Sequence, residues 1–140
     1  MQFQLIAADG LKFDGEAYEV VVPTKDGTIA VFAEHMPLIS AAAPGVLSVR
    51  KKASDGNDAM EHFAVYGGII QTEGKTARFV TDEITSADDV SEADAEKALA
   101  RARELVAGAT SRSELHEAQR VQAHHEARLH LAQLKRRHHR

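Results

Sequence analysis

Cysteine is absent from this 140-residue chain, and so is tryptophan. Without cysteine the protein can form no disulfide, no thiolate nucleophile and no zinc site built on thiolates. Such a composition is compatible with a reducing compartment. Aromatic residues make up only 5% of the sequence. The core must therefore come from valine, isoleucine, leucine, alanine and a few phenylalanines.

Long apolar runs are also absent. A membrane-spanning helix needs about 20 apolar residues, and the longest runs here have only a few. The first ten residues carry neither the basic segment nor the apolar stretch of a signal peptide, and they are not rich in arginine and serine like a transit peptide. We therefore expect the protein to reach a membrane only through a partner.

Catalytic and nucleotide-binding motifs are missing too: the sequence contains no P-loop, GxGxxG, HExxH or GxSxG pattern. Gly67-Gly68 is the one adjacent glycine pair, and β-type sequence follows it instead of a helix N-terminus. This favours backbone packing or a tight turn over a phosphate cradle. His35 and His62 lie beside no recognisable nucleophile motif. We expect no catalytic residue, no cofactor and no metal.

The first 86 residues contain a series of short β-type segments separated by turn residues. This pattern predicts an antiparallel β sandwich or barrel over residues 1–86. A hairpin loop is expected at Ser54–Asn57. The expected strands are 2–6, 19–23, 28–32, 46–50, 63–66, 69–72 and 77–80.

Over residues 87–140 the residue pattern changes and predicts helix. A polar linker (86–91) ends at Ser91, which has an acid, Asp94, three residues later. Ser111 repeats this capping spacing with Glu114. The first helix should end near Ala107, with Gly108 as a C′ glycine. The short link between the helices demands an antiparallel hairpin. The fold class is thus α+β with segregated parts.

The apolar stripes of both helices are rich in alanine. Little apolar area is buried between alanine faces, so the hairpin should be marginally stable and able to move. The first stripe is Ala95, Ala98, Leu99, Ala102, Leu105 and Val106. The second is Leu115, Ala118, Val121, His125, Leu129 and Ala132.

Charge and histidine gather at the C-terminal end. Residues 111–140 carry seven basic and three acidic side chains, while residues 1–110 carry 10 basic and 18 acidic ones. Six of the eight histidines also lie there: His116, His124, His125, His130, His138 and His139. No two of these share the i,i+3 or i,i+4 spacing of a metal pair. A solvated polar face is favoured, and a pH-sensitive docking face is the alternative. The basic segment lacks the aromatics of nucleic-acid binders. Two interpretations stay open for it: a solvated helix end whose cations suit the C-terminal dipole, and a docking face for an acidic protein.

Several short blocks follow one another in the β-type part of the chain. They are Pro23, a turn containing Gly27, a block ending in His35-Met36-Pro37-Leu38, Pro44-Gly45-Val46, and a later Gly67-Gly68 pair. In this order and spacing the chain resembles the epsilon subunit of bacterial F-type ATP synthase. The resemblance extends through Ala87-Asp88-Asp89-Val90 into the alanine-rich helix.

Two departures from the family pattern stand out. The family's Pro-Gly before the histidine is Ala33-Glu34 here, which allows a different bend of this loop. Relatives that bind ATP carry an Ile-Asp-x-x-Arg-Ala motif, and the arginine position here is Asp94. An acid repels phosphates, so we expect ATP to bind weakly or not at all.

The resemblance implies a ten-stranded sandwich plus a hairpin in a non-catalytic central-stalk subunit of a rotary proton-translocating ATP synthase. The implied partners are the gamma subunit, the c ring and the alpha and beta catalytic subunits, with no nucleic acid. The implied location is peripheral, on the cytoplasmic face of the bacterial plasma membrane. The sandwich would couple gamma to the c ring, and an extended hairpin would inhibit ATP hydrolysis.

By the same resemblance, His35 lies in the gamma-facing block and Lys25, Asp26, Gly27 and Thr28 form the turn that faces the c ring. The basic residues expected to contact acidic segments of the catalytic subunits are Arg120, Arg128, Lys135, Arg136 and Arg137. Two alternatives stay open: a free-standing adaptor that binds an acidic protein through the basic helix, and a small histidine-dependent hydrolase.

Overall fold

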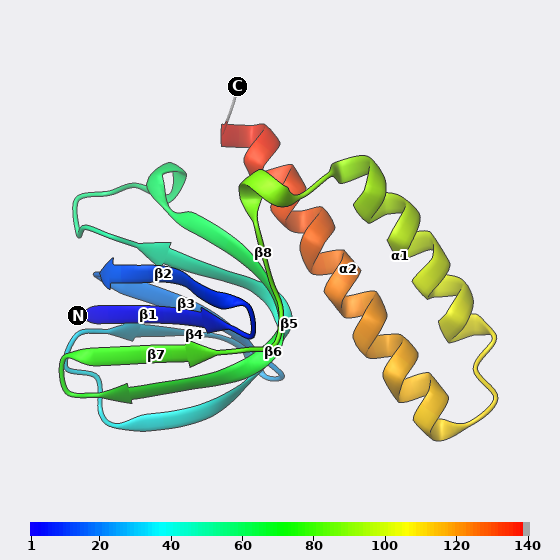
Figure 1. Ribbon diagram of the computed structural model, residues 1–140, viewed down its shortest axis with the longest axis horizontal. Coiled ribbons are helices and arrows are strands. Elements are labelled where there is room, and N and C mark those ends of the chain that lie inside the picture. The colour runs from blue at the N-terminus through cyan, green and yellow to red at the C-terminus, as the bar shows by residue number, and fades with distance from the viewer. Residues whose placement is uncertain (139–140) are drawn as a thin grey trace.

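The computed structural model describes residues 1–138. Within that range eight strands precede two long helices, which confirms the predicted sandwich followed by a helical hairpin (Figure 1). The strands are β1 (Gln2–Ala7), β2 (Gly10–Glu16), β3 (Glu19–Thr24), β4 (Gly27–Phe32), β5 (Leu38–Arg50), β6 (Glu61–Glu73), β7 (Thr76–Val80) and β8 (Ile84–Ser86). The helices are α1 (Glu92–Ala107) and α2 (Arg112–His138), with short 3₁₀ turns at η1 (Asn57–Ala59) and η2 (Ala87–Asp89).

The strands form one sheet that bends into two layers. The hydrogen-bonded order is β2-β1-β7-β6-β5-β3-β4, with β8 beside β6. All neighbours are antiparallel except β1 and β7. The first half of β6 pairs with β8, and its second half pairs with β7. β6 therefore passes from one layer into the other, and β5 runs along its whole length.

The continuity of β5 and β6 corrects two expectations. Residues 63–66 and 69–72 belong to a single 13-residue strand and not to two strands joined by a turn. Residues 1–138 contain eight unbroken strands, not the ten that the resemblance implied. The count reaches ten if β5 and β6 are each counted once in each layer. Sequence reasoning also missed β2, although Leu11 and Phe13 alternate there with Lys12 and Asp14. It missed β8 because three residues are too few to show a pattern.

Gly68 shows why the glycine pair is needed at the bend of β6. Its φ of +139° lies outside the range that other residues readily adopt. A Cβ there would lie 2.6 Å from the Val80 carbonyl oxygen and 2.8 Å from the Phe79 ring. The pair thus serves backbone packing, the first of the two roles predicted for it.

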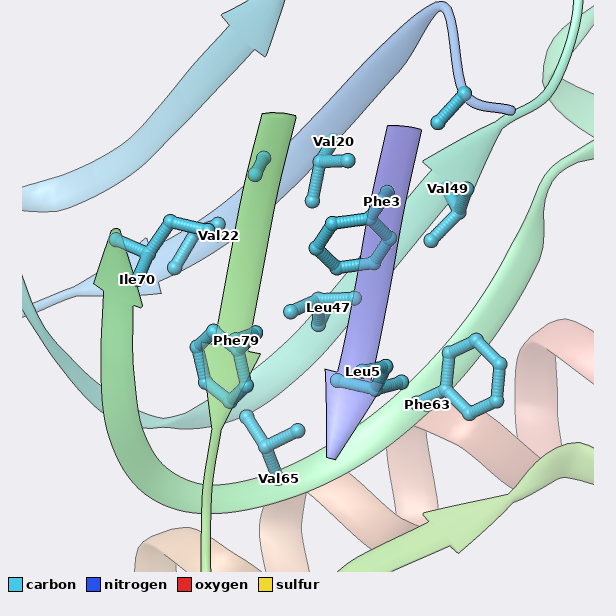
Figure 2. Packing of buried hydrophobic residues seen from close by; sticks show 12 residues of the cluster. Phe3, Leu5, Val20, Val22, Leu47, Val49, Phe63, Val65, Ile70 and Phe79 are labelled. Carbon is cyan, nitrogen blue, oxygen red and sulfur yellow. The ribbon is translucent and has the colours of Figure 1, made fainter. Parts of the chain in front are cut away.

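The core lies between the two layers (Figure 2). Phe3, Leu5 and Phe79 from one layer meet Leu47 and Val20 from the other, and all five side chains are fully buried. Every buried member of this cluster lies between residues 3 and 79. The core therefore contains no side chain from α1 or α2.

Candidate functional site: the docked hairpin and the sheet surface

The two helices begin where local sequence predicted. The Asp94 N–H donates to the Ser91 hydroxyl over 3.3 Å, and the Glu114 N–H donates to the Ser111 hydroxyl over 3.1 Å. These bonds satisfy N–H groups that have no partner within their own helix. At the other end of α1, Gly108 is the C-cap with a φ of −92°, so it does not adopt the predicted left-handed C′ conformation.

The hairpin is docked on the sandwich through α2. Figure 1 shows α2 lying along β5 and β6, with α1 packed on the far side of α2. The apolar part of the contact consists of small side chains apart from Leu131, which is fully buried. Ala127, Leu131 and Ala132 of α2 pack with Ala64 and Val90. One leucine and several alanines give a contact of modest strength.

The buried face of α2 differs from the predicted stripe. Ala118 and Ala132 are buried as expected, but Leu115 is 37% exposed. His124, Ala127 and Leu131 are buried although the stripe omitted them. On α1, Ala95, Leu99 and Ala102 are buried as predicted, whereas Leu105 is 59% exposed. The additional burial on α2 arises because this helix packs against both the sandwich and α1 and therefore buries two faces.

Tyr66 of β6 is the polar centre of the docking contact. The His124 ring meets it edge-on with centroids 4.7 Å apart. The Arg120 guanidinium lies 5.0 Å from the centroid of the same ring, and the Tyr66 hydroxyl donates to Glu117 over 3.4 Å. Burial, followed by the nearby Glu117 carboxylate, raises the pKa of the Tyr66 hydroxyl.

The histidines of α2 do not all face solvent. His124 is 8% exposed, and burial lowers the pKa of its imidazole. His125 is half-buried, and burial followed by the nearby Arg128 lowers the pKa of that ring as well. Because a guanidinium can only donate, the 3.2 Å contact from Arg128 Nη1 makes His125 Nδ1 an acceptor. His116 and His130 are exposed as predicted, while the His138 and His139 side chains lie outside the described residues.

Several of the predicted basic site residues are engaged in the docked state. Arg120 contacts Tyr66, Arg128 contacts His125, and Arg136 forms a 3.1 Å ion pair with Glu92 at the start of α1. Lys135 lines a cavity of about 390 Å³ between α2 and the sandwich. Arg137 is exposed. The predicted set is therefore divided between the docking contact and the surface.

The predicted turn at Lys25–Thr28 joins β3 to β4, and the Thr24 hydroxyl donates to the Gly27 carbonyl across it. The turn lines a groove of about 750 Å³ whose other side includes His116 and Arg120 of α2. The fold therefore brings two separately predicted groups, the turn and part of the basic helix, to one groove.

His35 lies at the opposite end of β4 from that turn. Its Nδ1 donates to the Met36 carbonyl over 2.8 Å, which fixes the tautomer because a carbonyl oxygen can only accept. The preceding Glu34 has a φ of +65°, the only positive φ at a non-glycine residue in the described chain. Glu34 thus adopts a left-handed bend at the position where the family pattern has glycine.

A surface feature that sequence reasoning missed is an apolar row across the outside of one layer. Strand register puts five apolar residues side by side on five neighbouring strands. They are Leu11, Ile6, Val80, Ile69 and Ala41, and we refer to them as the apolar row. Ile69, Val80 and Leu11 are 53%, 47% and 52% exposed. Adjacent Ile69 and Ile70 were the available signal, since neighbours on a strand face opposite sides.

Met36 and Ile39 extend this surface toward the His35 loop. Met36 is 79% exposed and Ile39 is 72% exposed. Ile39 lies two residues before Ala41 on β5, so both point to the same side of the sheet. An apolar surface of this extent is typical of a protein-binding site.

Catalytic or metal-binding geometry is not found in residues 1–138. No group of three or more potential metal ligands lies together there. Ser48 hydrogen-bonds His62 over 2.7 Å, but these two residues lie directly opposite each other on β5 and β6, so the contact is a cross-strand pair. Neither described helix combines the length and apolar character needed to cross a membrane.

Comparison with known proteins identifies the family. Residues 1–87 match the family described as ATP synthase, Delta/Epsilon chain, beta-sandwich domain. The ATP synthase epsilon chain of Brucella anthropi is 30% identical over 110 residues, which cover 79% of this chain and 78% of that one. The epsilon chain of Brucella suis is equally similar.

Solved structures show the same fold. A chain in the mitochondrial ATP synthase of Euglena gracilis superposes with a TM-score of 0.77 at 18% identity, covering 91% of this chain and 78% of that chain. A chain in the central stalk and c-ring structure of the Tetrahymena thermophila enzyme gives 0.63 at 14% identity, covering 91% and 92%. On the sequence match over residues 1–87 and the similarity to curated epsilon chains, this chain belongs to the epsilon-chain family of F-type ATP synthase, as a non-catalytic subunit.

Proposed function

We propose that this chain is a central-stalk subunit that couples the gamma subunit to the c ring through its sandwich and inhibits ATP hydrolysis through its hairpin. The observation that carries the proposal is the separation of the core from the hairpin. Every buried residue of the sandwich core lies between residues 3 and 79, and the hairpin adds only a small, partly polar contact. Such an element can detach while the sandwich stays folded in the stalk.

The gamma subunit is the proposed partner of the apolar row and its extension. Met36 directly follows His35 and Ile39 lies three residues further on; the family resemblance assigns His35 to the gamma-facing block. Apolar side chains on five neighbouring strands, with Leu11, Ile69 and Val80 about half exposed, offer a broad, rigid surface for an obligate contact. The c ring is the proposed partner of Lys25–Thr28, because this exposed polar turn lies at the other end of β4 from His35.

Inhibition requires release of the hairpin. In the docked state Arg120 and Arg128 contact Tyr66 and His125, and Arg136 pairs with Glu92. Release would free these cations for acidic segments of the alpha and beta catalytic subunits. Docked and released hairpins are thus the two states whose ratio sets hydrolysis. The location that follows is peripheral, on the cytoplasmic face of the bacterial plasma membrane, held by the rest of the complex.

The test is ATP hydrolysis by the reconstituted complex with and without residues 88–140. We expect both forms to assemble and hydrolysis to be faster without the hairpin. Equal hydrolysis at every pH and salt concentration would contradict the inhibitory role. A chain that fails to co-purify with ATP synthase subunits from membranes would contradict the stalk role and favour the adaptor.

The gamma surface has its own test. Ile69→Lys should weaken binding to the gamma subunit, because a charge would then have to be buried in the contact. Leu105→Lys is the matched control, since Leu105 is similarly exposed but lies on α1. Equal binding by the two variants would rule out the apolar row as the gamma site.

A further inference from the structure

The strongest unexplained feature is the burial of a titratable ring in a detachable contact. His124 is 8% exposed at the junction of α2 and β6, and its ring packs on Tyr66. Among the described residues its Nδ1 has no hydrogen-bond partner. A buried ring nitrogen without an acceptor is poorly suited to carry a proton and its charge.

The charges around His124 act in both directions, and Glu83, which favours protonation, is the largest of them. On α2 the groups that face it are Arg128 and His125, and Arg120 lies one turn earlier over the Tyr66 ring. The opposing charges are Glu83, which precedes β8, and Glu117, which accepts from the Tyr66 hydroxyl. Glu83 is exposed, so its attraction is screened by water. Burial is the largest effect, and it favours the neutral ring.

We propose that His124 is an acid-sensitive latch: docking of α2 on the sandwich requires a neutral ring, and protonation of His124 releases the hairpin. Release is a property of the chain alone. Only its consequence for ATP hydrolysis rests on the proposed function.

The direction of the pH dependence follows from burial. The docked ring has a pKa below the ordinary value of 6.5 that it regains on release. Docking is therefore at full strength above pH 6.5 and weakens as the pH falls below that value. For a single proton, the ratio of released to docked chains should rise by up to about tenfold per pH unit in this range.

The experiment measures docking in the full chain. Because the chain has no cysteine, Asp58→Cys and Gln119→Cys provide a unique pair of spin labels, one on the sandwich and one on α2. Both original residues are exposed. We expect one narrow distance at about pH 8 and a growing second population between roughly pH 6.5 and 5. Circular dichroism verifies that the sandwich stays folded.

Two variants identify the responsible ring. His124→Phe keeps an aromatic ring against Tyr66 but cannot be protonated, so the narrow distance should persist at low pH. His130→Gln removes an exposed histidine from the same helix and should behave like the natural chain. A natural chain that stays docked near pH 5, or a His124→Phe chain that releases with the same profile, would overturn the latch.

An NMR titration of the His124 ring in the natural chain measures its pKa directly and does not depend on any variant folding correctly. A midpoint below 6.5 is expected, and one at or above that value would overturn the latch. These readouts involve no partner subunit. Acid release without any change in hydrolysis would therefore contradict the proposed function and leave the latch intact.

Discussion

The rings of Tyr66 and His124 meet edge-on, with centroids 4.7 Å apart and planes inclined at 67°. Tyr66 belongs to the strand that runs through both layers of the sandwich, and His124 belongs to the helix that docks on it. The pair lies beside contacts made by alanines and one leucine. It therefore supplies a large share of the specific contact between the two parts of the chain.

Removing the tyrosine ring should weaken docking without unfolding the sandwich. Tyr66→Ala loses an aromatic pair worth about 0.5–1.5 kcal/mol and a cation–π contact of about 0.5–1 kcal/mol. We expect faster amide hydrogen exchange across residues 124–132 in the variant. Tyr18→Ala is the matched control, because Tyr18 forms a similar edge-on pair with Phe32 away from the hairpin. Exchange that rises equally in both variants would show that Tyr66 does not hold the hairpin.

A chain ending at Ala87 should fold on its own and still join the stalk. Truncation uncovers the small apolar residues Ala64 and Val46 and the Tyr66 ring on the sandwich, whereas the buried core cluster ends at Phe79. We expect a cooperative thermal transition within a few degrees of the full chain, since little apolar area is exposed. A non-cooperative transition, or failure to support assembly, would show that the boundary between residues 86 and 87 is wrong.

Reversing the basic charges of α2 should raise ATP hydrolysis by the assembled enzyme. Exposed ion pairs contribute about 0–1 kcal/mol each, so one change should do little and several together should shift the equilibrium. The variant replaces five residues with glutamate: Arg120, Arg128, Lys135, Arg136 and Arg137. Added salt should weaken inhibition in the natural enzyme for the same reason.

Since three of those cations also contact groups in the docked hairpin, docking must be measured alongside hydrolysis. A matched control reverses Lys97, Arg101 and Arg103, which are exposed on α1. Hydrolysis unchanged by the α2 reversal in a complex that still assembles would rule out these residues as inhibitory contacts.

Glu34→Gly should stabilise the sandwich. A left-handed conformation costs a non-glycine residue about 1–2 kcal/mol, and glycine gives back about 0.4–1 kcal/mol through the entropy of the unfolded chain. The free energy of unfolding in urea should therefore rise by about 0.5–1 kcal/mol. Ala33→Gly, in the same loop but without a positive φ, should lower it. Glu34→Gly that destabilises the chain as much as Ala33→Gly would show that the bend at Glu34 carries no strain.

Local features were predictable because short-range chemistry decides them. The β-branched run that forms β3 needs only its own residues and the turn at Gly27 to define its ends. The serine caps at Ser91 and Ser111 likewise depend on backbone groups three residues away. The turn at Lys25–Thr28 was identified from sequence for the same reason, whereas the loop at His35 was singled out by the family resemblance.

The buried face of α2 and the apolar row depended on contacts between elements far apart in the sequence. The sequence of α2 has small apolar residues on more than one side, so it could not specify which face would be buried. Docking on both β6 and α1 decided this, and it buried His124 while leaving Leu115 partly exposed. The apolar row likewise exists only through strand register, because its members come from five strands and the β1–β7 pairing joins the two ends of the sandwich sequence. Contacts between segments far apart in the chain therefore decide both the proposed latch and the proposed gamma surface. No local sequence pattern specifies those contacts.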